Sequence, residues 1–183
     1  MSKVYVFLAD GFEEIEGLTV VDLLRRAGEE GETVSIMGRK MIEGSHKIKV
    51  EADALFEETD FTEGKMLVLP GGMPGTRHLG AYKPLTDMLC DWDTKGKQLA
   101  AICAAPSVFG GLGFLKDRKA TSYPGCLDGI PVGEYTEEPV AVDGNVVTSR
   151  GVGTAIAFAL KLIEVLISKE KADEIAASIV YPV

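Results

Sequence analysis

The chain has 183 residues, of which 46% are hydrophobic and 26% charged, and its 28 acidic and 19 basic residues give a net charge of −9. A surface of that sign repels phosphate backbones, so the composition argues against nucleic-acid binding. The apolar runs fall short of the ~18 residues that a membrane span requires, so we expect no membrane segment. At ~150 residues per domain, the length predicts one domain over residues 1–183.

Cysteine and histidine are both scarce. The three cysteines form no Cys-x-x-Cys pair, and the only histidines are His46 and His78. These counts argue against a disulfide framework and a zinc site, and we expect neither a metal nor another cofactor. The first apolar run leads at once into acidic residues, which indicates a first strand and not a signal peptide. Unpaired thiols without a signal peptide predict a reducing, cytoplasmic location.

In the first half of the chain, short apolar runs alternate with longer amphipathic segments. Residues Lys3–Ala9 predict a strand, and Glu13–Arg26 predict a helix. Three further strand patterns follow: Thr33–Met37, the alternating segment IKVEADAL from Ile48, and Met66–Leu69, which ends in Pro-Gly-Gly.

The second half continues the alternation. The region near Pro84–Thr94 predicts a helix, and Gln98–Ile102 a buried strand that leads through Cys103 into another helix. The segments PVAV and NVVTS, joined near Asp143-Gly144, predict a hairpin, and two helices close the chain near Thr154–Leu166 and Lys169–Ser178. This order predicts an α/β fold, a three-layer sandwich with a mainly parallel sheet.

Sites in such folds form where loops leave the carboxyl ends of parallel strands. Three loops of this sequence have that position: Asp10–Phe12, Pro70–Gly75 and the turn at Cys103. We therefore expect the functional residues there.

Cys103 stands where a predicted strand becomes a helix. The run Ala101-Ile102-Cys103-Ala104-Ala105 has the pattern of a nucleophile elbow, with alanines in place of the usual glycines. A structural buried cysteine is the alternative, because free cysteine is among the most buried residue types. An activated thiol needs about 2.7 kcal/mol of thiolate stabilisation to lower its pKa from ~8.5 to ~6.5, and backbone N–H groups of the LPGGMPG loop could supply part of it.

Glu16 is the second unusual residue. It shares one face of its predicted helix with Val20, Leu23 and Leu24, so a carboxyl group lies on an apolar stripe. The alternative is a carboxylate at the edge of the stripe that reaches water. Glu13 and Glu14 are explained as first-turn acids that the helix dipole favours.

The segments ADGFEEIE, LVLPGGMPG, AAICAAPS and TSRGVGTA, in that order, resemble the ThiJ/PfpI superfamily. More narrowly, they resemble its branch of the parkinsonism-associated protein deglycase. The resemblance covers essentially the whole chain and implies a flavodoxin-like sandwich that forms a homodimer. It implies that Cys103 is a reactive cysteine, that Glu16 is its partner carboxyl, and that Gly72 and Ala104 offer backbone N–H groups. Ionised Glu16 about 4 Å from a thiolate would cost about 4 kcal/mol, so we expect Glu16 to be protonated when Cys103 is ionised.

The chain also departs from the pattern of its relatives. Tyr123, in ATSYPGCLDG, stands where many relatives have a histidine, so a Cys-His pair lacks its base and proteolysis is not expected. Tyr123 either binds substrate or is a packed aromatic. Arg26 matches an arginine that relatives place near the site, although a cation at a helix C-terminus explains it equally well. Cys126 is a weak candidate for a resolving thiol, and Cys90 is expected to be packed.

Two functions fit these residues. In the first, which the resemblance favours, the chain is a cofactor-independent enzyme for reactive aldehydes (methylglyoxal, glyoxal) or early glycation adducts, and it forms 2-hydroxy acids as a glyoxalase III or protein deglycase does. Cys103 attacks the aldehyde, and Glu16 moves protons. In the second, Cys103 is the peroxide-responsive thiol of a redox sensor or stress chaperone, held by Gly72, Ala104 and protonated Glu16. A degenerate member with a structural cysteine is the third possibility.

Overall fold

One mixed sheet organises the computed structural model, which describes residues 3–182. The strand order is β10-β11-β7-β6-β1-β2-β5, and every neighbouring pair is parallel except β10 with β11. The strands are β1 (Lys3–Leu8), β2 (Glu30–Ser35), β5 (Ala54–Leu55), β6 (Gly64–Leu69), β7 (Gln98–Ile102), β10 (Val140–Asp143) and β11 (Val146–Ser149).

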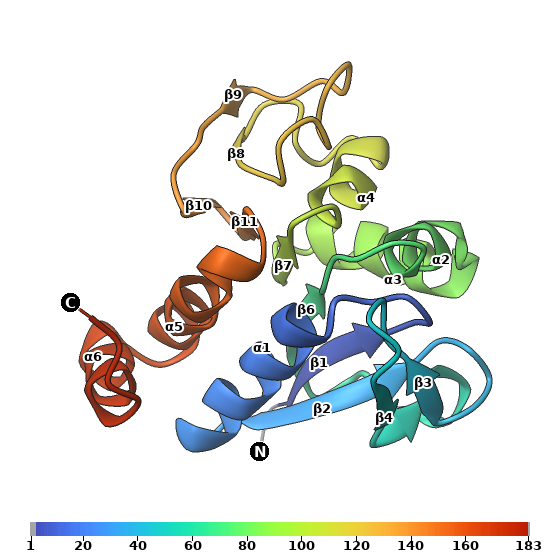
Figure 1. The fold of residues 1–183 in the computed structure, drawn as a ribbon. Coiled ribbons are helices and arrows are strands. Elements are labelled where there is room, and N and C mark those ends of the chain that lie inside the picture. Colours follow the sequence, from blue (N-terminus) through green and yellow to red (C-terminus); the bar gives the residue numbers. More distant parts are fainter. Residues whose placement is uncertain (1–2, 183) are drawn as a thin grey trace.

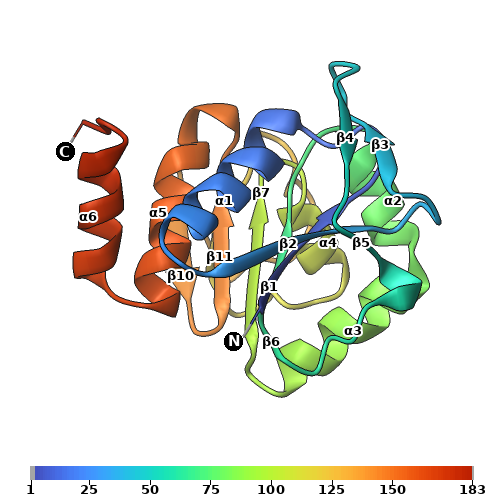
Figure 2. The same cartoon turned by 90° about the horizontal axis from the view of Figure 1, so that it is seen from below.

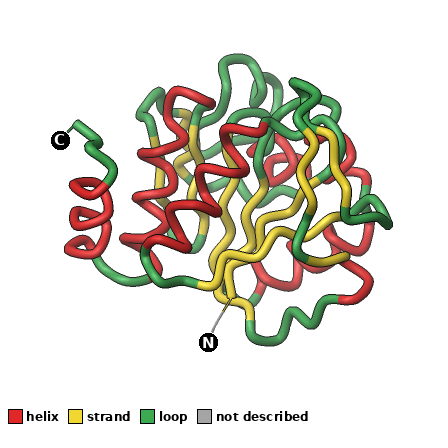
Figure 3. The backbone as a smooth tube through the Cα atoms, turned by 60° about the horizontal axis from the view of Figure 1, so that its bottom comes forward, coloured by secondary structure: helices red, strands yellow, loops and turns green. Residues whose placement is uncertain are grey.

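Helices cover both faces of this sheet (Figures 1 and 2). One face carries α1 (Glu14–Arg26) and α5 (Ala155–Leu166), with α6 (Lys169–Ser178) beside α5 at the outer edge. The other carries α2 (Gly75–Ala81), α3 (Lys83–Thr94) and α4 (Pro106–Gly111). The tube view shows the strands between two groups of helices (Figure 3). The predicted three-layer sandwich with a mainly parallel sheet is confirmed.

Alternation along the strands builds a separate core on each face. In β1, Val4, Val6 and Leu8 pack toward α1 and α5, whereas Tyr5 and Phe7 pack toward α2, α3 and α4. All five side chains are completely buried. Such strands read as continuous hydrophobic runs because both faces are covered.

The long elements lie close to their predicted bounds, and the short ones were missed. Unpredicted elements are β3 (Met41–Glu43), which pairs with β4 (Lys49–Glu51) in a hairpin, helix α2, the pair β8 (Lys119–Ala120) and β9 (Glu134–Tyr135), and the 3₁₀ turns η1 (Phe56–Glu58) and η2 (Val152–Thr154). The strand predicted from Ile48 is divided into β4 and β5. The cause is Asp53, whose carboxylate accepts hydrogen bonds from the Thr33 N–H at 2.9 Å and the Thr33 hydroxyl at 2.7 Å.

Within residues 3–182, none of the helices combines the length and the apolar composition that crossing a membrane takes.

Candidate active site

The three loops expected to form the site follow adjacent strands of the sheet. Strand β6 lies between β1 and β7, and all three run parallel, so their carboxyl ends lie at one edge. The loop after β1 is tied to the loop after β6 by a hydrogen bond of 2.8 Å from the Glu13 N–H to the Gly71 carbonyl. Helix α1 begins directly behind this contact, with Glu13 as its N-cap.

Cys103 lies at the sharp turn between β7 and α4. Its φ of 66° is in the left-handed region, which is uncommon for a residue with a side chain. Two backbone hydrogen bonds hold this conformation: its N–H donates to the Ser149 carbonyl at 3.0 Å, and its carbonyl accepts from the Tyr123 N–H at 2.8 Å. The flanking Ala101 and Ala105 are completely buried, which agrees with the need for small residues at this turn.

Glu16 is completely buried against Cys103. Its Oε2 accepts a hydrogen bond of 2.9 Å from the Gly71 N–H, whereas its Oε1 has no partner among the described residues. Burial raises the pKa of Glu16 to about 7, in the direction that the neutral form requires. The apolar stripe predicted for α1 is also observed, because Val20, Leu23 and Leu24 are buried on the same side of the helix as Glu16.

Burial and the adjacent carboxylate raise the pKa of the Cys103 thiol above its ordinary value, and the Ala104 N–H opposes this rise. Two negative charges in contact are unfavourable in a buried site, so thiol and carboxyl titrate as a coupled pair. Once Glu16 is ionised, the remaining proton of the pair is on the sulfur. Transfer of this proton from Cys103 to Glu16 changes no net charge, and it forms the thiolate beside a neutral carboxyl group.

Glycines let the β6 loop approach this pair. A Cβ on Gly71 would lie 2.6 Å from the Cys103 Cβ and 2.7 Å from the Glu16 Oε2. Gly72 has a φ of 89°, and a Cβ there would lie 2.4 Å from the backbone nitrogen of Glu13. Both positions therefore require glycine if the loop is to reach Cys103.

A cleft of about 480 Å³ opens over the cysteine. Four of the predicted site residues line it together: Cys103, Glu16, Gly72 and Tyr123. Ala104 follows Cys103 directly and interacts with its sulfur through the backbone N–H. The Tyr123 side chain is not packed, because the residue is 54% exposed at the edge of the cleft. No histidine is among the described residues that line it.

The β11–α5 connection supplies the part of the cleft that the sequence reasoning missed. It is lined by Arg150, Gly151, Val152, Gly153 and Thr154, which all belong to the motif TSRGVGTA, although no role was predicted for them. A Cβ on Gly151 would lie 3.9 Å from the Glu16 Oε1 and 4.0 Å from the Cys103 Sγ. The missing side chain therefore leaves space directly beside the reactive pair.

Arg26 does not reach this cleft. It lies in the last turn of α1, ten residues after Glu16, which places it about 15 Å along the helix from the first turn. Its side chain pairs with Asp22 at 2.7 Å on the surface. Arg26 was interpreted either as an arginine near the site or as a cation at a helix C-terminus. Its position in this chain agrees with the second interpretation.

Two smaller expectations need correction, and a third stays a prediction. Cys90 is exposed on α3 and not packed. Glu13 and Glu14 do begin α1, but both are buried and contact the turn between β3 and β4, which a general dipole effect does not explain. Cys126 is a free, partly buried thiol that does not line the cleft, but it is near enough to Cys103 to raise its pKa, so its role as a resolving thiol stays a prediction.

Comparison with known proteins identifies the family to which this fold belongs. The model of the DJ-1/PfpI family matches residues 2–165. The chain is 38% identical over 180 residues to Protein DJ-1 homolog B of Arabidopsis thaliana. The aligned region covers 97% of this chain and 41% of that protein. It is 33% identical over 166 residues to a protein named deglycase from Pyrococcus abyssi, covering 90% of this chain and 99% of that protein. The structure of oxidized DJ-1 from Toxoplasma gondii has a TM-score of 0.95 and 40% identity, with 100% coverage of both chains.

The fold and the site together define an α/β sandwich with a cysteine–carboxyl pair at the carboxyl edge of its parallel strands. The chain belongs to the DJ-1/PfpI family. It spans less than half the length of the two Arabidopsis relatives, 41% of one and 45% of the other.

Proposed function

We propose that this chain is a cofactor-independent enzyme that converts small 2-oxoaldehydes such as methylglyoxal into 2-hydroxy acids. The observation that carries the proposal is the contact of a partly exposed thiol, Cys103, with a completely buried carboxyl group, Glu16, in an open cleft. A thiol nucleophile beside a group that can take and return its proton is the arrangement that such chemistry needs.

The first step is addition of the thiol to the aldehyde. Glu16 takes the proton of Cys103, and the sulfur forms a bond to the aldehyde carbon. Negative charge then develops on the carbonyl oxygen, and in this proposal the N–H groups of Gly72 and Ala104 stabilise it. Glu16 then returns its proton to that oxygen, which gives a hemithioacetal and leaves Glu16 ionised for the second step.

The second step moves a proton between the two carbons of the substrate. Ionised Glu16 removes the C–H proton of the former aldehyde carbon and returns it to the neighbouring ketone carbon through an enediol. The product is a thioester on Cys103, which water hydrolyses to free the thiol. The aldehyde carbon is oxidised and the ketone carbon is reduced, so methylglyoxal and water give lactic acid without an external oxidant or reductant.

Early glycation adducts are a second substrate class for the same chemistry. Hemithioacetals and hemiaminals of methylglyoxal release the free thiol or amine and regenerate the aldehyde, to which Cys103 then adds as above. The Pyrococcus abyssi relative named deglycase supports this extension. The exposed Tyr123 side chain at the edge of the cleft is placed to contact the thiol or amine part of such an adduct.

A redox role is the second candidate function. The relative from Toxoplasma gondii is described as oxidized, which favours testing whether peroxide reacts with the thiol of this chain. In this case Cys103 would take up oxygen before the other two cysteines, and no aldehyde would be converted.

The test is to incubate the purified chain with methylglyoxal and measure lactate against a buffer blank. We expect lactate from the wild type and from Cys126→Ala and Cys90→Ala, which keep the site. Cys103→Ala should form no more than the blank, and Glu16→Gln should lose on the order of 10²–10⁴-fold in rate because proton transfer fails.

Wild-type lactate no higher than the blank would reject the enzyme proposal. Mass spectrometry after peroxide treatment would then test the redox role, which requires oxidation of Cys103 ahead of Cys90 and Cys126.

A further inference from the structure

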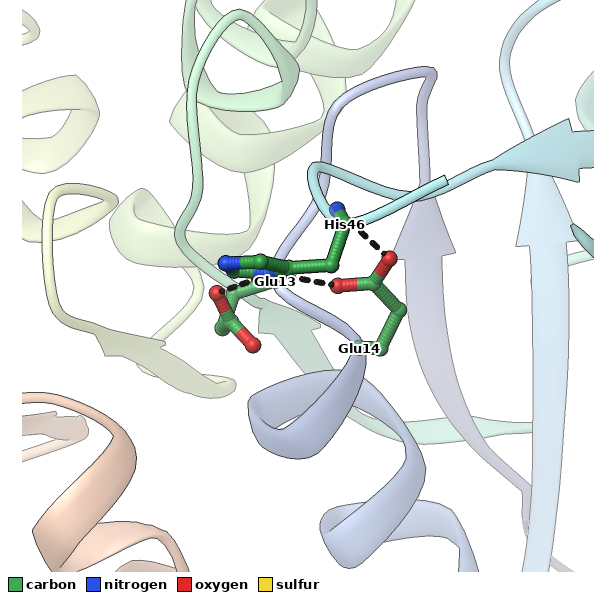
Figure 4. A group of neighbouring side chains, drawn as sticks. All are labelled: Glu13, Glu14 and His46. Carbon is green, nitrogen blue, oxygen red and sulfur yellow. Dashed lines mark hydrogen bonds and ion pairs between the residues drawn. The ribbon is translucent and has the colours of Figure 1, made fainter. Parts of the chain in front are cut away.

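A second cluster of reactive side chains lies at the start of α1. The turn between β3 and β4 crosses the helix N-terminus here, and Figure 4 shows the His46 imidazole between the carboxyl groups of Glu13 and Glu14. Backbone contacts fix the turn to the helix, since the Ser45 N–H donates to the Phe12 carbonyl at 2.8 Å. The proximity of these residues therefore does not depend on side-chain conformation alone.

The two carboxylates are buried and have few cationic neighbours. Backbone N–H groups of His46 at 2.8 Å and Ile48 at 3.4 Å donate to Glu14 Oε1, while Glu14 Oε2 faces His46 Nδ1 and Ser45 Oγ. The side chains of Glu13 and Glu14 are 11% and 4% exposed. Among residues 3–182, no lysine or arginine nitrogen lies within 4.0 Å of either carboxylate, and His46 is their only basic neighbour. Buried carboxylates in close contact repel each other unless a cation or a proton lies between them.

Both separations from the imidazole to the carboxylates match those around a small tetrahedral ion, and the three ligand atoms all lie within 4.8 Å of one another. His46 Nδ1 lies 3.2 Å from Glu14 Oε2 and 3.4 Å from Glu13 Oε2. Zinc–ligand bonds of about 2.0–2.1 Å in a tetrahedron separate neighbouring ligands by about 3.3–3.4 Å. Ser45 Oγ lies 3.3 Å from each Oε2 and 3.0 Å from Nδ1, near the fourth corner, where a water or the hydroxyl itself would complete the site.

We propose that Glu13, Glu14 and His46 bind a divalent transition-metal ion of the size of zinc. One imidazole nitrogen and two carboxylate oxygens suit zinc and its neighbours in the first transition series, whereas calcium and magnesium require oxygen ligands in larger number. The scarcity of histidine in the sequence argued against such a site, but a single histidine is sufficient where two buried carboxylates provide the other ligands. This proposal does not rest on the proposed aldehyde chemistry.

Zinc binding is best measured in the full chain with Cys103→Ser, because the neighbouring thiol is itself a candidate zinc ligand. After treatment with a chelator, calorimetric titration with Zn²⁺ near pH 7 should show one ion bound per chain. His46→Ala in the same background should weaken binding at least about 100-fold, since changes even to residues outside the ligand shell cost 10–100-fold. His78→Ala, which changes the other histidine, should bind as before.

X-ray absorption at the zinc edge provides the second measurement. We expect a first shell of nitrogen and oxygen at about 2.0–2.1 Å without sulfur. Zinc should raise the melting temperature of the Cys103→Ser chain but not that of its His46→Ala variant, because only a site in the folded state stabilises it.

Each alternative outcome would overturn the proposal. If the Cys103→Ser chain takes up no zinc, or if His46→Ala binds zinc as tightly, the three side chains form only a hydrogen-bonded contact between the β3–β4 turn and α1. A sulfur shell would assign the zinc to Cys90 or Cys126.

Discussion

The chemistry proposed for this protein depends on one proton shared by Cys103 and Glu16. Glu16 is completely buried and has a pKa raised to about 7, while the pKa of Cys103 is raised by burial and by the charge of Glu16. Neither group is activated on its own. We therefore expect a thiolate to form at neutral pH by transfer of the proton to the carboxyl group, and we expect Glu16 to control the reactivity of Cys103.

Replacing Glu16 by glutamine should change the pH dependence of stability. Because the folded-state pKa is raised from 4.5 to about 7, the contribution of neutral Glu16 is complete below about pH 4.5 and is lost as pH rises through about 7. This pKa difference corresponds to about 3 kcal/mol in the free energy of unfolding. The wild type loses this amount as pH rises, whereas Glu16→Gln, which does not titrate at this position, keeps it. Between about pH 4.5 and pH 8, the variant should therefore gain up to that amount relative to wild type in urea unfolding.

The exposed Glu137→Gln is the matched control and should follow the wild-type curve at every pH. Parallel curves for Glu16→Gln and wild type would mean that Glu16 is ionised in the folded protein without cost, contrary to its burial.

Among single residues, the sequence identified those whose pattern conflicts with their surroundings. A carboxyl group on an apolar stripe marked Glu16, and a thiol at a strand-to-helix turn marked Cys103. Gly151 does not conflict with its surroundings in the sequence pattern. It contributes to the cleft only because it has no side chain, and a pattern does not show this. Arg26 lies away from the cleft because ten helical residues separate it from Glu16, a distance that a motif match does not reveal.

At the scale of elements, the site depends on three loops that approach closely at the end of parallel strands. The β6 loop is the least tolerant of substitution, since the Gly71 N–H donates to Glu16 and Gly71 lies against Cys103. Here the strand order places the loops side by side, and glycines permit contact between them.

Gly71→Ala should disrupt the pair from within the β6 loop. Its Cβ would lie 2.6 Å from the Cys103 Cβ and 2.9 Å from the Ile102 carbonyl oxygen, and the backbone there cannot move freely. Overpacking of this kind costs about 1–3 kcal/mol, so we expect a lower urea midpoint. The rate of Cys103 alkylation by iodoacetamide, followed by mass spectrometry, should also change because Glu16 loses its position.

Gly111→Ala on α4 provides the comparison, because no atom lies within 4 Å of its Cβ. This variant should be as stable as wild type or up to about 1 kcal/mol more stable, with unchanged alkylation. An equally small effect of Gly71→Ala would show that the loop can move away from Cys103.

The elements that the sequence predicted are those long enough to show a period. Helix α6 has its predicted bounds, and α1 and α5 each differ by one residue at the start. The three-residue strand β3 is too short for a period to appear, and β4, its partner in the hairpin, was predicted only as part of one longer strand. That hairpin nevertheless brings His46 to α1. The sequence shows the three residues of the proposed metal site, but it does not show that they lie together.

At the scale of the whole molecule, the sheet separates two hydrophobic cores, and only one of them contacts Cys103. The core under α1 and α5 includes Val20, Leu24 and Phe158, and Cys103 packs against it. The core under α2, α3 and α4 includes Leu89, Trp92 and Phe109. Both cores share the strands of one sheet, so we expect the described residues to unfold in a single transition.

Leu89→Ala should therefore weaken the fold without altering the chemistry of the site. Leu89 is completely buried on the face opposite α1, and removing its side chain from a packed core costs about 2–5 kcal/mol. The urea midpoint should fall with a single transition, while the lactate formed per folded molecule stays at the wild-type level. Leu18→Ala, at a 36% exposed position on α1, should change stability by no more than about 0.5 kcal/mol. A loss of activity in Leu89→Ala that exceeds its unfolded fraction would mean that the sheet transmits packing changes from one core to the reactive pair on the other.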